Sequence, residues 1–419
     1  MTMISDLPND LEAEILSRVP AKSLSRLKTT CKRWYALFRD PKFVVKNKKL
    51  GRAVRESILL TNHGDVCSVA GDLHDTVVNT PIEVSGKLTS LKGSNDFDFA
   101  EIFHCDGLML CSELGNDRLV VWNPCTGQTR NIKARTSFQT NQTYALGYST
   151  SSPSGHSYKI LRYFDYRNDQ EVWVPQCEIY DLSSDSWRVL DSFPLDYIMF
   201  RDGISLKGDT YWVAGHNESG YFMMKFDFPT ERFVCLPLPI PIERFEDRFV
   251  LSVVRDEKLA VLLIDDSSDY LSYDRSEAMR IWVSNKISED EVWVAFRALG
   301  LLLVADCARS WVSFEIRDRQ NIRRVAAVAD ANKDLSWRSD LVLEVDFDNY
   351  SKNFRSFLLD EENKVAILCC GIEFVGEYYT TIIYIIGEDM LKEVYTGTIT
   401  ASRSHSPLVI TYVPSLVRI

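Results

Sequence analysis

The chain has 419 residues, of which 45% are hydrophobic, and its formal net charge is −11. This length allows two or three domains with sizeable cores, and the acidic balance argues against a nucleic-acid platform or a binder of anionic membranes. The beginning of the chain lacks the profile of a signal peptide, and no apolar run is long enough to span a bilayer. We therefore expect no nucleic-acid or membrane partner, and a location in the cytoplasm, the nucleus or both.

The first fifty residues predict four short helices. Pro8 suits the opening turn of the first helix, because a residue there needs no backbone donor. Leu11 and Ile15 lie four residues apart and therefore share one face of that helix. Pro20 ends it and can open the second helix, and Asp40-Pro41 is a cap and proline that can begin the fourth.

A segment this short buries a low fraction of its surface, so part of its apolar stripe should contact another protein. Residues 4–46 resemble an F-box. The matching motifs are Leu-Pro at 7–8, a leucine three residues on, Glu-Ile-Leu at 14–16, Val-Pro at 19–20, Lys-Ser-Leu at 22–24 and Cys-Lys-x-Trp at 31–34. The resemblance implies docking on the Skp-type adaptor of a cullin–RING ubiquitin ligase. The alternative is an ordinary helical cap on a larger domain.

The resemblance also implies which residues face the adaptor. The main apolar contact would comprise Leu7, Pro8, Leu11, Ile15, Leu16, Val19 and Pro20. A second group would either extend that contact or support its helices, namely Lys22, Leu24, Leu27, Cys31, Lys32 and Trp34.

Charge is unevenly divided along the chain. Residues 1–60 hold 13 Lys and Arg against 6 Asp and Glu, a net of +7, so the rest of the chain carries −18. The resemblance implies an acidic adaptor, and complementary charge would speed docking to it. A solvated basic face remains the alternative.

Beyond residue 55 the periodicity becomes strand-like, with short apolar and aromatic runs separated by Gly, Asp, Asn and Ser. Three hairpins are predicted: Ile204–Leu206 with Tyr211–Val213, Leu251–Val254 with Leu259–Leu263, and Phe357–Leu359 with Val365–Cys369. Turns of three to five residues favour an antiparallel architecture, because parallel strands need long crossovers.

An internal repeat begins at Trp122-Asn123, Tyr180-Asp181 and Phe226-Asp227, in copies 58 and 46 residues apart. In each copy a Ser or Thr follows the aromatic residue at four positions, a residue that would face the aromatic at seven, and an aliphatic one at ten. We interpret the pattern as an outer hairpin whose Asn or Asp and hydroxyl satisfy the turn backbone. A degenerate fourth copy stands at Ile281–Val283.

Spacing near fifty residues is typical of kelch-like propeller blades, and residues 55–419 could supply about six or seven. The following blocks resemble the F-box-associated domain of the large plant F-box/kelch family: Cys105–Cys111, Val121–Gly127, Leu206–Trp212 and Phe226–Phe228. That match is good over residues 100–240 and looser beyond about 270. We predict a small all-α F-box (1–50) followed by an all-β domain (51–419) with a separate core. Its expected fold is a kelch-like β-propeller, and a two-sheet β-sandwich is the alternative.

A closed ring needs its terminal strands to meet. Val409–Val413 is rich in β-branched residues, and we predict that it pairs with Ser57–Thr61. The physical reason is that an open sheet edge is an aggregation liability.

No motif in the chain points to catalysis: the nucleophile elbow, zinc helix, phosphate loop and dinucleotide fingerprint are all missing. The six histidines are scattered, and the ten cysteines are best interpreted as reduced, mostly buried thiols. We therefore expect no catalytic residue, no metal and no cofactor. Asp265–Arg275 and Tyr163–Asp169 are candidate target-binding loops, with plain solvated loops as the alternative.

Two functions compete. The first is the substrate-recognition subunit of an SCF-type (Skp–cullin–F-box) ubiquitin ligase, in which the F-box docks on the adaptor and the β domain binds an unidentified target protein. The second is a propeller enzyme or small-molecule sensor whose F-box controls its own turnover. A receptor needs an exposed rim of aromatic and charged residues, whereas an enzyme or sensor needs a deep axial pocket with convergent polar groups. We expect the receptor.

Overall fold

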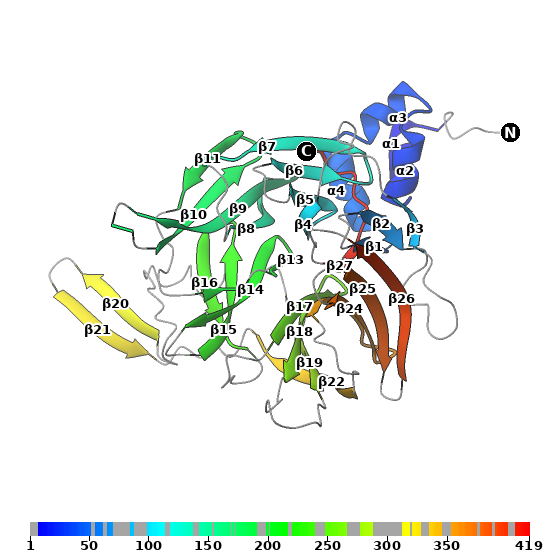
Figure 1. The fold of residues 1–419 in the computed structure, drawn as a ribbon. Coiled ribbons are helices and arrows are strands. Elements are labelled where there is room, and N and C mark those ends of the chain that lie inside the picture. The colour runs from blue at the N-terminus through cyan, green and yellow to red at the C-terminus, as the bar shows by residue number, and fades with distance from the viewer. Residues whose placement is uncertain are drawn as a thin grey trace.

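The computed structural model begins with four helices, as predicted, and continues in strands (Figure 1). The helices are α1 (Asn9–Leu16), α2 (Ala21–Leu27), α3 (Lys32–Leu37) and α4 (Pro41–Leu50). The described residues are 7–51, 55–61, 65–69, 84–87, 99–113, 118–136, 142–152, 155–168, 170–171, 173–190, 198–200, 202–216, 220–238, 248–265, 277–287, 312–318, 321–327, 335–345, 353–374, 378–387, 390–400 and 407–419. We call residues 9–50 the N-terminal module.

Six antiparallel sheets form blades around a central axis. Blade 1 comprises β27 (Leu408–Tyr412), β1 (Glu56–Leu60), β2 (Val66–Val69) and β3 (Val84–Lys87). Blade 2 comprises β4 (Phe99–Cys105), β5 (Leu108–Glu113), β6 (Arg118–Asn123) and β7 (Gln128–Lys133). Blade 3 comprises β8 (Thr143–Ser152), β9 (Gly155–Arg167), β10 (Trp173–Asp181) and β11 (Ser186–Val189).

The other three blades continue the ring. Blade 4 comprises β12 (Ile198–Met199) and β13 (Ile204–Leu206), which both pair with β14 (Asp209–His216), then β15 (Gly220–Asp227) and β16 (Arg232–Leu236). Blade 5 comprises β17 (Arg248–Val254), β18 (Lys258–Asp265), β19 (Glu277–Ser284) and β22 (Trp337–Val345). Blade 6 comprises β23 (Asn353–Asp360), β24 (Val365–Phe374), β25 (Tyr378–Gly387) and β26 (Met390–Thr400).

The fold is therefore a six-bladed β-propeller, and the alternatives of seven blades and of a two-sheet sandwich are wrong. The predicted ring closure is confirmed, because Ser57 pairs with Thr411 and Leu59 with Val409 in an antiparallel β1–β27 ladder. The C-terminal strand thus becomes the innermost strand of a blade whose other strands come from the N-terminal side. The three predicted hairpins are confirmed as β13–β14, β17–β18 and β23–β24.

Neighbouring blades bury six apolar clusters between them, one for each junction of the ring. Side chains alternate along each strand, so consecutive residues face opposite neighbours. In β1, Ile58 and Leu60 pack against blade 2, whereas Leu59 between them packs against blade 6. This two-sided burial explains why the inner strands are continuously apolar in sequence.

The internal repeat corresponds to the outer hairpins of blades 2, 3 and 4. The residue seven positions after each aromatic lies opposite it: Trp122 pairs with Thr129, Tyr180 with Trp187, and Phe226 with Phe233. The polar residue after each aromatic accepts turn N–H groups, as in the contact of Asn123 Oδ1 with the amide of Cys125 (2.9 Å). The outer hairpin and the role of its Asn or Asp are therefore confirmed for these three copies. Among the hydroxyls, that of Thr126 accepts a turn amide, whereas those of Ser184 and Thr230 contact side chains.

The fourth copy has a different partner. Its strand β19 occupies the equivalent place in blade 5, but β22 completes that blade, so residues 285–336 intervene where the other copies have a tight turn. The intervening chain contains a separate hairpin formed by β20 (Val312–Asp318) and β21 (Asn321–Ala327). This insertion explains why the pattern is degenerate at this position.

The C-terminal tail, residues 413–419, joins the N-terminal module to the blades. Leu416 is 4% exposed and packs with Leu16, Leu24, Phe38 and Phe43 of the helices. The expectation of separate cores is therefore wrong, since the helices are too short to bury these side chains alone.

The tail is equally well fixed to the propeller. Asn123 Nδ2 donates to the carbonyl oxygens of Ser415 (3.0 Å) and Val417 (2.7 Å), and the Val417 side chain lies in the core between blades 2 and 3. Gly107, with φ +77°, lies so close to the tail that a Cβ there would lie 2.4 Å from the Cβ of Ser415. Glycine is thus needed at this turn for both its conformation and the close approach.

We expect Leu416→Ala to loosen the N-terminal module without unfolding the propeller. The change leaves a cavity in the core of the helices, and such a truncation costs about 2–5 kcal/mol. Amide hydrogen exchange should therefore speed up in α1, α2 and α4. Val417→Ala is the matched control. Val417 packs on blades 2 and 3, so its truncation should accelerate amide exchange in those blades and not in the helices. Equal exchange of the helices in both variants would contradict the shared core.

Candidate functional site

The helices present an apolar face on α1. Leu11 and Ile15 are 50% and 45% exposed, although both are large aliphatic residues. Among the predicted adaptor-contact residues, the exposed ones are Pro8, Leu11, Ile15, Lys22, Cys31 and Lys32. Leu7, Val19, Pro20, Leu27 and Trp34 are partly buried. Their contact with an adaptor stays a prediction.

Two of the predicted contact residues lie in the core instead. Leu16 is 3% exposed and Leu24 is 0% exposed, and both pack against Leu416 of the tail. Leu16 was expected in the main apolar contact, and this placement corrects that expectation. Leu24 supports the helices, which was one of its two expected roles. The spacing of apolar residues along a helix cannot distinguish a face that contacts a partner protein from a face that contacts the chain's own tail.

A buried carboxylate connects α1 to α3. Glu12 is 1% exposed, accepts a hydrogen bond from Trp34 Nε1 at 2.7 Å and forms an ion pair with Arg33. Trp34 therefore positions α1, whatever it contributes to an adaptor contact. Asn47 of α4 adds a second brace, since its Nδ2 donates to the carbonyl oxygens of Ser17 (2.9 Å) and Val19 (2.8 Å) beyond the end of α1.

We expect Trp34→Phe to destabilise the helices by about 1–3 kcal/mol, because it leaves the buried carboxylate of Glu12 without one of its donors. Urea unfolding followed by exchange of α1 and α3 amides would measure the loss. Tyr35→Phe is the control: Tyr35 is 47% exposed, and removing its hydroxyl should change stability by less than about 0.5 kcal/mol. Equal losses in the two variants would rule out a bracing role for the indole N–H.

Polar contacts hold the N-terminal module on the hairpin turns of the propeller. Ser25 Oγ donates to the carbonyl of Cys125 (2.5 Å), and Lys28 Nζ donates to that of Thr126 (2.8 Å), both in the outer turn of blade 2. Lys48 of α4 forms an ion pair at 2.7 Å with Asp106 in the inner turn of the same blade. The exposed face of α1 therefore has a defined orientation relative to the blades.

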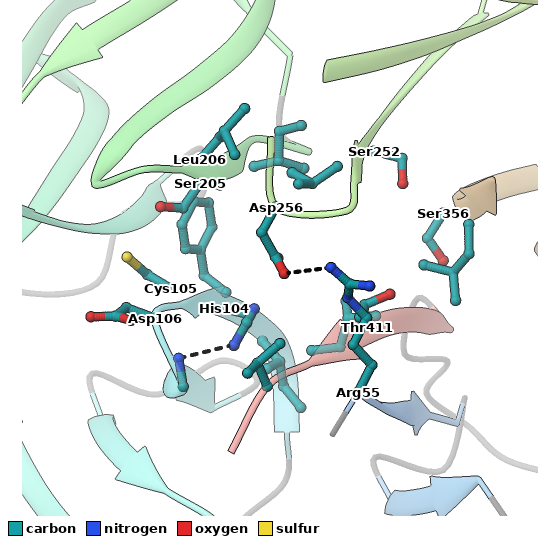
Figure 2. A pocket seen from close by; sticks show the side chains of 18 of the residues that line it. Arg55, His104, Cys105, Asp106, Ser205, Leu206, Ser252, Asp256, Ser356 and Thr411 are labelled. Carbon is teal, nitrogen blue, oxygen red and sulfur yellow. Dashed lines mark hydrogen bonds and ion pairs between the residues drawn. The ribbon is translucent and has the colours of Figure 1, made fainter. Parts of the chain in front are cut away.

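The axis of the propeller contains a cavity of about 890 Å³. It is lined by the innermost strands of all six blades, by residues of α2 and α4 and by the tail. Figure 2 shows His104, Arg55 and Asp256 gathered in it, with hydroxyl groups of Ser205 and Thr411 nearby. The cavity therefore lies at the junction between the N-terminal module and the propeller.

The cavity groups suit binding better than nucleophilic chemistry. Burial raises the pKa of the Cys105 thiol to about 12, so this thiol is protonated at neutral pH. Burial also lowers the pKa of His104, which outweighs the opposing effect of Asp256 and Asp106 and favours the neutral ring. Its Nε2 accepts the Gly107 amide at 3.2 Å, so the ring proton is on Nδ1. Within the described residues, no group of three His, Cys, Asp or Glu side chains could hold a metal ion.

The two predicted recognition loops have different outcomes. Residues 163–167 are part of strand β9, and Phe164 is only 2% exposed, so the prediction of an exposed loop is wrong there. Alternating aromatic and polar residues at this site belong to the part of β9 that extends past β8 and pairs with β10 as far as Arg167. Residues 266–275 lie outside the described residues, and Asp265 ends strand β18.

The sequence interpretation missed the tail and the cavity. Leu416 and Val417 are apolar and are therefore expected to be buried, but their spacing does not indicate whether they pack against the helices or against the blades. Arg55 and Asp256 are 201 residues apart, and only ring closure brings them within 3.4 Å.

Comparison with known proteins identifies the class to which this fold and this exposed helix face belong. A family model described as an F-box domain matches residues 4–46, and one described as an F-box associated beta propeller domain matches residues 56–333 and 324–419. The chain belongs to this family of F-box proteins with an F-box-associated β-propeller.

Similar full-length proteins come from Arabidopsis thaliana. One is 47% identical over 425 residues, covering 100% of this chain and 93% of its own length. An F-box/kelch-repeat protein is 45% identical over 426 residues, covering 100% of this chain and 96% of its own, and another is 35% identical over 440 residues with both chains covered in full. A solved selenium-binding protein from Sulfolobus tokodaii aligns with a TM-score of 0.39 and 10% identity over 90% of this chain and 98% of its own, too weak a likeness to add to the assignment. Among the described residues, no helix is long and apolar enough to cross a membrane.

Proposed function

We propose that this protein is the substrate-recognition subunit of an SCF-type ubiquitin ligase. The F-box docks on a Skp-type adaptor and, through it, on a cullin, while the propeller binds a target protein for ubiquitylation. The protein acts in the cytoplasm, the nucleus or both. In this role it supplies no catalytic group of its own and works by holding the target at a fixed place relative to the ligase.

The observation that carries this proposal is the exposed pair Leu11 and Ile15 on α1. Large aliphatic side chains are half-exposed here although the helices bury other apolar side chains against one another and the tail, which is the pattern of a surface that a partner covers. The pair lies on a helix that the buried Glu12 and Asn47 brace from the other side. The surrounding net charge of +7 over residues 1–60 complements an acidic partner.

The axial cavity supports a second role, the binding of a small molecule. Its volume of about 890 Å³ lies in the range of ligand sites, and charged and hydroxyl groups converge on it. This role does not compete with adaptor docking, because the two surfaces use different residues.

We expect the double change Leu11→Ala with Ile15→Ala to weaken adaptor binding by roughly thirty- to a thousandfold, since it removes two central apolar anchors. Binding of the full chain to a recombinant Skp-type adaptor, measured by calorimetry, checks this. Leu50→Ala is the matched control, because Leu50 is equally exposed, at 45%, but lies at the end of α4.

Thermal unfolding of both variants should match that of the original chain, because neither substitution enters a buried cluster. Adaptor affinity that survives the double change, or that falls equally with Leu50→Ala, would overturn the F-box docking mode. An unfolding temperature lowered only in the double variant would instead show that the α1 face is structural.

A further inference from the structure

Arg55 has an incompletely satisfied guanidinium at the wall of the axial cavity. Its Nε is buried and has no hydrogen-bond partner among the described residues. Its one ion pair within the described part of the chain, to Asp256, joins the nearest N and O atoms at 3.4 Å, longer than the usual charge-assisted contact. By contrast, Arg255 on the same cavity wall reaches Glu362 at 2.6 Å. Because the Nε atom is buried, the donors available to an oxyanion are the terminal amino groups, which the long contact with Asp256 leaves weakly held.

The turn that carries Asp256 is strained in a way that the equivalent turns avoid. The inner hairpin turns of blades 2 and 4 have glycine at their second left-handed position, Gly107 and Gly208, with φ +77° and +91°. In blade 5 that position is Asp256, with φ +58°, and Arg255 before it has φ +53°. Two consecutive side chains in the left-handed region are unfavourable, and such strain gathers at functional sites. This position places a carboxylate in contact with Arg55 at the cavity wall (Figure 2).

The charges around the cavity are balanced. Six Lys and Arg side chains and six Asp and Glu side chains line it, so its surface does not select a multiply charged anion or cation. The cavity volume of about 890 Å³ exceeds that of a single inorganic ion by far and suits an organic molecule. A net-neutral ligand with both charges fits this surface.

We propose that the axial cavity binds a zwitterionic small molecule, an amino acid or a short peptide. Its carboxylate pairs with the Arg55 guanidinium, and its ammonium group pairs with Asp256. The two opposite charges on the protein lie side by side, as do the two charges of such a ligand. Arg55 and Asp256 would each exchange their long mutual contact for a short ion pair with the ligand. The remaining volume takes the ligand's side chain or further residues.

The position of Arg55 gives this site a consequence. Arg55 lies in the connection between α4, which ends at Leu50, and β1, which begins at Glu56. Asp256 belongs to blade 5, on another part of the ring. A ligand that bridges the two residues therefore ties the connection of the F-box to the propeller and stiffens the junction.

The test uses thermal unfolding of the full chain with each of the common L-amino acids and glycylglycine, at about 10 mM. At least one should raise the unfolding temperature by about 2 °C or more. For the strongest binder, the N-acetyl form keeps only the carboxylate, the amide keeps only the ammonium group, and the N-acetyl amide keeps neither. The zwitterion should bind most tightly, and each modified form should bind at least about tenfold more weakly.

Variants then assign the residues. Arg55→Gln and Asp256→Asn should each weaken binding at least about tenfold, whereas Arg255→Gln, on the same wall but already paired, should leave the affinity unchanged. Asp256→Gly guards against a folding defect, because glycine relieves the backbone strain and should keep the free protein at least as stable while still losing the ligand.

Three results would overturn the proposal: no amino acid or dipeptide shifts unfolding, a singly charged form binds as well as the zwitterion, or Arg255→Gln weakens binding as much as Arg55→Gln. Adaptor affinity, measured on the same variants, should not change. Loss of the ligand site and loss of the ligase role are therefore distinguishable.

Discussion

Asn123 clamps the C-terminal tail by donating its amide to the carbonyl oxygens of Ser415 and Val417, in a place where the side chain is 0% exposed. Each such bond contributes about 1 kcal/mol net, but leaving the buried partners unpaired would cost more. The clamp sets the tail so that Leu416 points into the helices and Val417 into the blades. The arrangement of the N-terminal module on the propeller depends on this contact, because both cores are completed by adjacent residues of one segment.

Ring closure and the clamp act together. The strand β27 pairs with β1 and so completes blade 1. The tail that follows β27 then leaves the ring beside blade 2, where the helices lie. Closure of the ring therefore delivers the tail to the F-box. In the proposed receptor role the helices would hold the adaptor and the propeller would hold the target, and the tail would fix how these two parts are placed relative to one another. The axial cavity lies within the same junction, so a ligand there would act on the connection between the two parts.

Much of the fold could be predicted because its signals are local. The cap and proline at Asp40-Pro41 begin α4, the aromatic–Asn/Asp–hydroxyl pattern marks outer hairpins, and β-branched residues at 409–413 mark the closing strand. What could not be predicted depends on which distant surfaces meet. Leu11 and Leu16 have the same chemistry and lie five residues apart on one helix, yet contacts with the other helices and the tail make Leu16 part of the core while Leu11 is exposed. Arg55 and Asp256 are single polar residues whose relation exists only in the closed ring.

Calorimetric unfolding of the intact chain, compared with a chain that ends at residue 413, tests the shared core most directly. We predict that the helices and the propeller of the intact chain unfold in one transition, because Leu416 completes the core of the helices and the adjacent Val417 completes a core of the propeller. Removal of the tail should split off an earlier transition for the helices. Two independent transitions in the intact chain would contradict the shared core. So would an unfolding profile that stays the same when the tail is removed.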